Sequence, residues 1–146
     1  KIFPALKNAK GNKIETYVSH DRCKTWTYQS EVKLFESSSN PPALLALHDG
    51  SLICIYGDRH HSRMAGKYSK DQGKTWGDEF IFRADFKDTN SYWDFGYPVL
   101  VQRPDAKLVC MYYWASNDNP QQFIAATIWT PQMEDELFAR ENMVQE

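Results

Sequence analysis

The chain has 146 residues and a formal net charge of −2, with 17 basic and 19 acidic side chains. A single domain of this length can bury a hydrophobic core. The balanced charge, without a cluster of Lys or Arg, argues against a nucleic-acid partner. No segment approaches the roughly 18 apolar residues of a membrane-spanning helix.

Residues 1–35 contain two predicted strands, at 13–19 and 25–35, which look like the last two strands of a sheet. The segment that joins them, residues 19–26, reads SHDRCKTW. Residues 37–40 (SSSN) form a polar linker to the next unit.

Residues 36–86 predict a four-stranded antiparallel meander. Its strands are expected at residues 42–47, 51–56, 63–69 and 75–82. The first strand is almost entirely apolar, so we expect it to be buried on both faces. The His48-Asp49-Gly50 turn joins it to the second strand, and residues 69–76, which read SKDQGKTW, join the third strand to the fourth.

Residues 87–130 repeat part of this pattern with three strands, expected at residues 97–103, 107–113 and 122–129. Residues 104–106 (PDA) form the first turn of this unit. Pro131 ends the pattern, and residues 131–146 predict a tail with a short helix that begins at this proline.

The two eight-residue segments share one pattern, Ser-x-Asp-x-(Gly/Cys)-x-Thr-Trp, with five identical positions. The Asp can accept hydrogen bonds from backbone N–H groups of its own turn, and Gly73 allows a positive φ. Cys23 stands in the place of this glycine, which predicts a more strained or slightly different first turn. The repeat is structural and performs no catalysis; its residues are Ser19, Asp21, Thr25, Trp26, Ser69, Asp71, Gly73, Thr75 and Trp76.

Antiparallel sheets of four strands that repeat every 40–50 residues or so are typical of β-propeller blades. The sequence therefore predicts an all-β protein with about two and a half blades. Because a propeller must close into a ring, we expect the chain to be part of a larger one. Eight Tyr, eight Phe and five Trp suit such a β-rich fold and also the recognition of carbohydrates.

The repeated turn resembles the Asp-box of the sialidase (neuraminidase) family, whose members are six-bladed propellers. Residues 13–129 resemble the C-terminal half of such a propeller. The likeness also includes residues 40–44 (NPPAL), 56–59 (YGDR) and 96–98 (GYP). It implies a glycoside hydrolase that is secreted or periplasmic, although no signal peptide is visible and the sequence begins with Lys1 rather than Met.

The resemblance also implies an active centre on the propeller axis. There, three arginines bind the substrate carboxylate, a tyrosine paired with a glutamate attacks the sugar, and an aspartate donates the proton. Tyr97 matches the nucleophile's place at the start of the last blade. Arg63, six residues before Ser69, or Arg59 would be one of the three arginines. Asp94 would orient Tyr97 or act as an acid.

Each candidate has a structural alternative. Tyr97 could pack at a blade edge, Arg63 could be a solvated charge at a strand end, and Asp94 could cap a turn.

His60 and His61 are candidates for contacting sugar. Adjacent side chains point apart and no carboxylate or Cys has ligand spacing, so we expect no metal and no cofactor.

Three aromatic residues are further candidates for contacting sugar, and three cysteines were considered as metal ligands. Trp93, like Tyr92 and Trp114, could stack on a sugar or fill the space between blades. Cys23, Cys54 and Cys110 have no metal-ligand spacing, and Cys54 and Cys110 lie in apolar runs, where we expect them to be buried.

The leading hypothesis is a sialidase-like glycoside hydrolase that removes a terminal acidic sugar from a glycan. The alternatives are a non-catalytic propeller that binds glycans or proteins, and a hydrolase specific for a different sugar. The expected partners are a glycan, and either further propeller blades or a second copy of the chain. Neither a nucleic acid nor a membrane span is expected.

Overall fold

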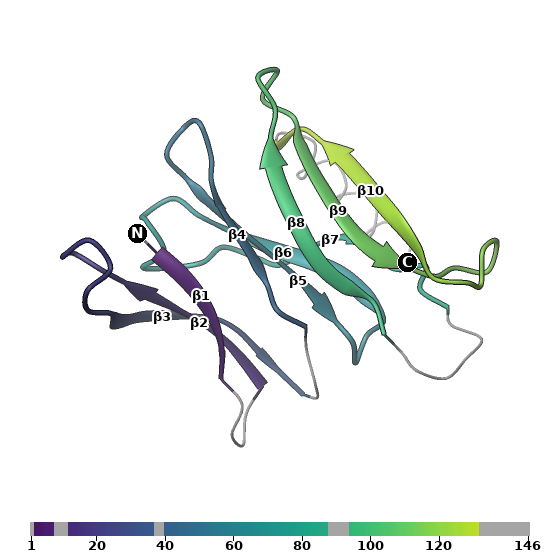
Figure 1. Cartoon of the computed structure of the whole chain (residues 1–146), viewed down its shortest axis with the longest axis horizontal. Helices are drawn as coiled ribbons and strands as arrows, with labels where there is room; N and C mark the ends of the chain where they lie inside the picture. Colours follow the sequence, from purple (N-terminus) through teal and green to yellow (C-terminus); the bar gives the residue numbers. More distant parts are fainter. Residues whose placement is uncertain (1, 8–11, 37–39, 88–93, 132–146) are drawn as a thin grey trace.

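A computed structural model describes residues 2–7, 12–36, 40–87 and 94–131 (Figure 1). These residues form ten β-strands in three antiparallel sheets, with no helix among them. None of them therefore belongs to a helix that could cross a membrane. The expected all-β architecture of consecutive propeller blades is confirmed. Figure 1 shows the three sheets side by side in chain order.

The first sheet has the strand order β1-β2-β3. Its strands are β1 (Ile2–Lys7), β2 (Asn12–Val18) and β3 (Thr27–Phe35). Only two strands were expected here, so the prediction missed β1. Proline inside a strand argues against a central strand, but β1 lies at the sheet edge with Pro4 opposite Thr16.

The second sheet has the predicted order of four strands, β4-β5-β6-β7. They are β4 (Ala43–Ala46), β5 (Leu52–Asp58), β6 (Arg63–Ser69) and β7 (Phe80–Arg83). The expected burial of the first strand was wrong: β4 is an edge strand with half-buried and exposed residues, whereas every residue of β5 is buried. The fourth strand begins at Phe80 rather than residue 75, because the turn extends to Gly77, whose N–H donates to the Tyr68 carbonyl at 2.8 Å.

The third sheet has the order β10-β9-β8. Its strands are β8 (Gly96–Gln102), β9 (Leu108–Trp114) and β10 (Phe123–Trp129), close to the predicted ranges. Residues 132–146, which include nearly all of the predicted helical tail, lie outside the described residues.

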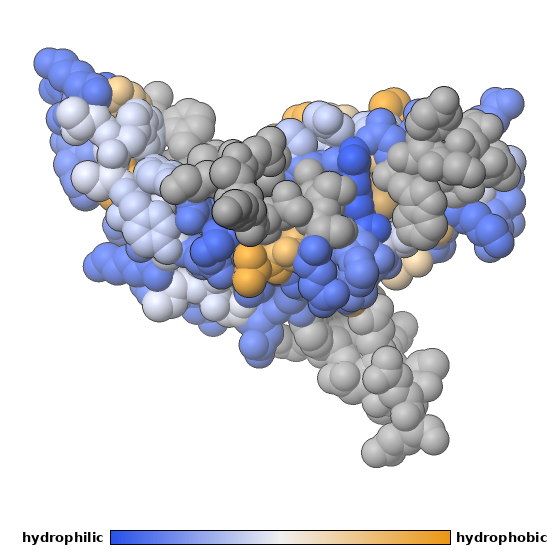
Figure 2. All heavy atoms as spheres, turned by 90° about the horizontal axis from the view of Figure 1, so that it is seen from below, coloured by the Kyte–Doolittle hydropathy of each residue, from blue (hydrophilic) through white to orange (hydrophobic). Residues whose placement is uncertain are grey.

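The hydrophobic core lies between neighbouring sheets. One cluster joins the first and second sheets through residues such as Ile14, Phe35 and Tyr56. A larger, aromatic cluster joins the second and third sheets and includes Phe95 and Trp114, both fully buried. Trp114 therefore fills the space between blades, one of the two roles considered for it. Figure 2 shows a view in which the surface is mostly hydrophilic, with hydrophobic side chains in small groups.

The first strands of the three sheets adjoin one another, since β4 contacts both β1 and β8. In a propeller the first strands line the central axis. The segment before β4 and the start of β8 meet at one end of this axis, where the Asn40 side chain lies against Gly96.

The two repeated turns have the same hydrogen bonds. In the second turn, one oxygen of Asp71 accepts from the Ser69 hydroxyl at 2.8 Å and from two backbone N–H groups, and the other accepts from the Thr75 hydroxyl at 2.6 Å. Asp21 makes the corresponding bonds in the first turn. Cys23 has a φ of 68° where Gly73 has 81°, so the first turn keeps the shape and carries backbone strain at Cys23.

Candidate functional site

The candidate site lies at the end of the axis where β5 ends and β8 begins. The β5–β6 loop supplies Arg59, the segment before β8 supplies Asp94, and the start of β8 supplies Tyr97. All three were candidates from the sequence, and Tyr113, at the end of β9, joins them through its contacts with Asp94 and Tyr97.

A β-bulge at the start of β8 directs Tyr97 outward. Gly96 pairs with Tyr113 and Val99 with Met111, so three steps along β8 match two along β9. Tyr97 has a φ of 49° and is 52% exposed. The left-handed conformation costs a residue with a side chain about 1–2 kcal/mol, and such strain is concentrated at functional sites.

Gly96, directly before Tyr97, permits a close approach of Asn40. Its φ is 107°, and a Cβ added to it would lie 2.7 Å from Nδ2 of Asn40. Asn40 is 1% exposed and also lies against Gly57 at the end of β5. The two glycines and the asparagine therefore hold the starts of β4 and β8 and the end of β5 together.

Asp94 accepts from two side chains. Arg59 pairs with it through a guanidinium N–H, and the Tyr113 hydroxyl donates to it. Burial of Tyr113 raises the pKa of its phenol, and the hydrogen bond to Asp94 raises this pKa further. Tyr113 therefore stays a neutral donor. The Tyr97 ring stacks on the Tyr113 ring, with 5.7 Å between centroids and 23° between planes.

Two buried nitrogen atoms at this site have no hydrogen-bond partner among the described residues: Nδ2 of Asn40 and Nε of Arg59. No other buried side-chain nitrogen or oxygen in the described part of the chain lacks one. A buried polar group without a partner is costly, and it often marks a place where a ligand or an ordered water binds. This end of the molecule is therefore polar, and the described side chains leave two of its buried donors without a partner.

Arg63, the other arginine candidate, belongs to a separate network of charges. Its Nε donates to Asp58 at 3.2 Å and its terminal nitrogen to Glu79 at 2.6 Å. Glu79 also accepts from the hydroxyl of Tyr56 at 2.8 Å and from Lys33 at 2.7 Å. Tyr56 is fully buried, so this tyrosine–glutamate pair is structural.

His60 and His61 follow Arg59 in the same loop. Nδ1 of His61 donates to Asp58 at 2.8 Å, and Nε2 of His60 lies 3.2 Å from a carboxylate oxygen of Glu36. The sequence predicted that the two side chains point apart, but their ring centroids are only 4.7 Å from each other. Glu36, directly after β3, supplies a carboxylate that the spacing of residues in the sequence did not indicate. Glu36, His60 and His61 are the one group of metal-ligating side chains found among the described residues.

Three of the residues that meet here, Arg59, Asp94 and Tyr97, were candidates from the sequence, and the other residues of the candidate site were not. Trp93 and Tyr92 lie outside the described residues. Asn40 was noted for its sequence motif, but no pattern indicated its contact with Gly96. Tyr113 could be found only from the register that places it opposite Gly96.

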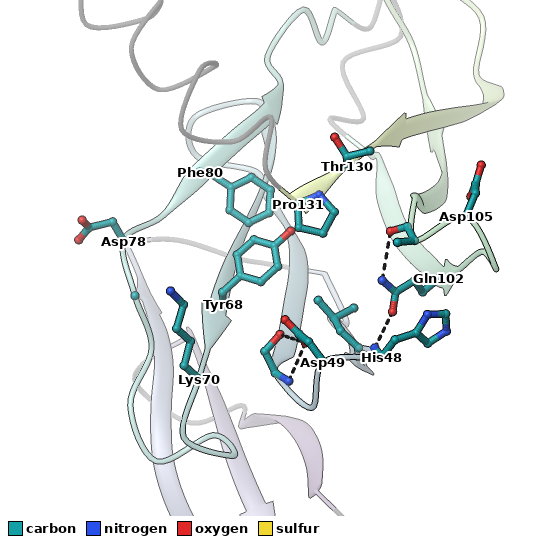
Figure 3. Close-up of a pocket in the computed structure, with 14 residues that line it drawn as sticks. His48, Asp49, Tyr68, Lys70, Asp78, Phe80, Gln102, Asp105, Thr130 and Pro131 are labelled. Atoms are coloured by element: carbon teal, nitrogen blue, oxygen red, sulfur yellow. Dashed lines mark hydrogen bonds between the residues drawn. The ribbon is translucent and has the colours of Figure 1, made fainter.

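The opposite end of the same sheets has an open cavity of about 990 Å³ between the second and third sheets (Figure 3). Tyr68, Phe80 and Pro131 form its apolar wall. Gln102 accepts from the His48 N–H at 2.7 Å and donates to the Ala106 carbonyl at 3.1 Å, which joins two turns at its rim. Figure 3 shows these turns bordering the cavity. None of the sequence candidates for catalysis or sugar binding that the structure describes lines it.

Comparison with known proteins supports the fold. No protein-family model matches the sequence, and no curated protein is significantly similar to it. Among solved structures, the chain is similar to the α-L-arabinofuranosidase from Fusarium graminearum, solved with an iminosugar inhibitor, with a TM-score of 0.59 and 19% identity. The match covers 87% of this chain and 39% of the Fusarium protein, so the chain spans well under half the length of that enzyme.

Proposed function

We propose that this chain belongs to a propeller glycoside hydrolase and carries part of its sugar-binding site at the end of β5 and β8. The bulge at Tyr97 carries the proposal. It holds an aromatic side chain in a strained conformation, half exposed, beside the Arg59–Asp94 pair. Strained residues of this kind cluster at active sites and ligand-binding sites.

The stacked rings of Tyr97 and Tyr113 would provide an aromatic surface for one face of a sugar ring. A few convergent polar groups beside such a surface are typical of small-molecule sites. Asn40 and Arg59 each have a donor without a partner among the described residues, and sugar hydroxyls are suitable acceptors.

Asp94 is the proposed acid or base. The side chain of Asp94 is 44% exposed, which leaves its carboxyl accessible, and Arg59 and Tyr113 hold it in position. Most glycosidases use two carboxyl groups, and the sialidase type replaces one by a tyrosine. The second catalytic group beside Asp94 would be either Tyr97 or a carboxylate from another blade. No described carboxylate contacts the Tyr97 hydroxyl.

The charges at the site favour a neutral terminal sugar. Arg59 is paired with Asp94, and Arg63 is paired with both Asp58 and Glu79. A substrate carboxylate would have to compete with these partners for either guanidinium. The Fusarium enzyme acts on a neutral arabinofuranoside, and we propose a sugar of this chemical class.

An acidic sugar, which the sialidase resemblance implies, is the second candidate. The unpartnered Nε of Arg59 favours it, because a carboxylate could accept from this nitrogen. The non-catalytic glycan-binding propeller would use the same surface without the proton transfer by Asp94. All three hypotheses are compatible with a secreted or periplasmic protein.

The test is hydrolysis of a panel of nitrophenyl glycosides that includes arabinofuranosides, neutral pyranosides, uronides and sialosides. We expect cleavage of a neutral glycoside, and a loss of about 10²–10⁴-fold in kcat for Asp94→Asn. Asp105→Asn is the matched control, since Asp105 forms an exposed pair with Arg103 (3.1 Å) near the turns at the other end.

Two variants of Tyr97 separate its roles. If Tyr97 is a stacking platform, Tyr97→Phe keeps kcat and Tyr97→Ala raises KM; if it is the nucleophile, both variants lose kcat. Preferential cleavage of a sialoside or uronide would favour the acidic substrate. Binding of a glycan without cleavage would favour the non-catalytic propeller. A protein that neither binds nor cleaves any of these glycosides would contradict the proposal.

A further inference from the structure

We propose that Glu36, His60 and His61 bind a divalent first-row transition-metal ion, with Zn²⁺ as the probe. Each residue offers one ligand atom, and these atoms all lie within 4.8 Å of one another. Glu36 directly follows β3 of the first sheet, and the histidines come from the β5–β6 loop of the second sheet. The proposed site therefore joins two neighbouring sheets, and it does not depend on the proposed hydrolase activity.

Asp58 prepares His61 for metal binding. Its carboxylate is 2% exposed and accepts from Nδ1 of His61 at 2.8 Å. Arg63 holds the same carboxylate oxygen at 3.2 Å, so the acceptor is fixed in place. A proton on Nδ1 leaves the lone pair of Nε2 for a metal, and a buried carboxylate behind a histidine is the usual partner of a metal ligand.

His60 and Glu36 provide the other two ligands. Nε2 of His60 and Oε2 of Glu36 are 3.2 Å apart, a separation that a shared proton or a metal ion can occupy. The rings of His60 and His61 are nearly perpendicular, at 84°, so one ion can be approached by both without the rings clashing. Metal ligands must be deprotonated, so the affinity for the ion should fall at acid pH.

The ligand set indicates the class of metal. Two imidazoles and one carboxylate suit zinc, copper, nickel or iron, whereas calcium and magnesium prefer oxygen ligands. Three protein ligands leave at least one coordination position open. All three residues are exposed, so an ion could enter from solvent without local unfolding.

Isothermal titration calorimetry with Zn²⁺ on the full chain tests the proposal. We expect one ion per chain, and at least a tenfold loss of affinity for His61→Ala and for Glu36→Gln. Asp58→Asn should weaken binding by about 10–100-fold, as is usual when the carboxylate behind a ligand histidine is lost. Circular dichroism checks that each variant is folded; His61 and Glu36 are exposed, so their variants remain informative if Asp58→Asn does not fold.

The matched controls are other exposed ligand-type residues. His20→Ala, His48→Ala and Cys23→Ser should each leave the affinity for Zn²⁺ within about twofold, because these residues lie outside the proposed site. Absence of saturable binding to the wild type would overturn the proposal. So would unchanged binding in His61→Ala and Glu36→Gln, or loss of binding in one of the controls.

Discussion

Asp71 and Asp21 show how one side chain specifies a turn. In each turn a single carboxylate accepts from two hydroxyl groups and two backbone N–H groups. These bonds favour the ionised form, and the Thr75 hydroxyl contributes most to lowering the pKa of Asp71, to about 2. Thr25 has the same effect on the pKa of Asp21, which is also strongly lowered.

The lowered pKa predicts how stability depends on pH. An unperturbed carboxyl has a pKa of 3.8 and folded Asp71 one of about 2, so its stabilisation is complete above the higher value and is lost as pH falls through the lower one. In urea unfolding, Asp71→Asn should therefore lower the midpoint at pH 7, and the difference from wild type should shrink steadily as pH falls from 4 towards 2. Asp78→Asn, an exposed carboxylate outside the turn, should show no such convergence. A constant difference across this range would contradict the prediction.

At the level of elements, the second sheet depends on close packing of β5 and β6. Every residue of β5 is buried. Gly66 lies opposite Ile55 in the register, and a Cβ added to Gly66 would lie 2.9 Å from both the Cys54 carbonyl oxygen and the Phe80 ring. Backbone atoms cannot move aside cheaply, so only glycine is accommodated at this position.

Gly66→Ala is therefore expected to destabilise the protein by about 1–3 kcal/mol through overpacking. Gly77→Ala is the matched control, because a Cβ there would lie 3.6 Å from the Tyr68 carbonyl oxygen, an ordinary contact. We expect the control to change the free energy of unfolding by no more than about 0.5 kcal/mol. Chemical denaturation monitored by tryptophan fluorescence measures both. Equal effects of the two substitutions would contradict this account.

At the level of the whole molecule, one face of the third sheet is apolar and exposed. Cross-strand pairs place rows of side chains on this face, such as Val99 beside Met111. Apart from Tyr97, which lies at the end with the proposed site, its exposed large members are Val99, Val101, Met111, Ile124 and Ile128. In the proposed protein, further propeller blades or a second copy of the chain would bury this face.

The exposed face predicts that the chain by itself associates. Ile124 is 77% exposed, so Ile124→Lys should reduce self-association without loss of folding stability. Gln121→Lys adds the same charge in the neighbouring exposed loop and keeps the apolar face intact, so it should have a smaller effect. Sedimentation velocity over a range of concentrations compares the variants. A monomeric wild type at all concentrations would contradict the prediction.

Residue patterns predicted the strands and turns because these depend on local interactions. The His48-Asp49-Gly50 turn has its glycine at a φ of 86°, and the Asp71 turn has the hydrogen bonds that its residues indicated. The same reasoning missed β1, because a proline in an edge strand resembles a break. It also placed the start of β7 too early, since the long-range bond from Gly77 to Tyr68 has no local signal.

By itself, the sequence determined an all-β meander in blades and the positions of the repeated turns, and it selected Tyr97, Asp94 and Arg59 as candidates for the site. Only the tertiary structure decided which charges meet. Arg59 pairs with Asp94, 35 residues away, whereas Arg63 is held by Asp58 and Glu79. Glu36 reaches His60 from another sheet. Such pairings follow from the packing of sheets and the register of strands, which bring together residues that no short pattern connects.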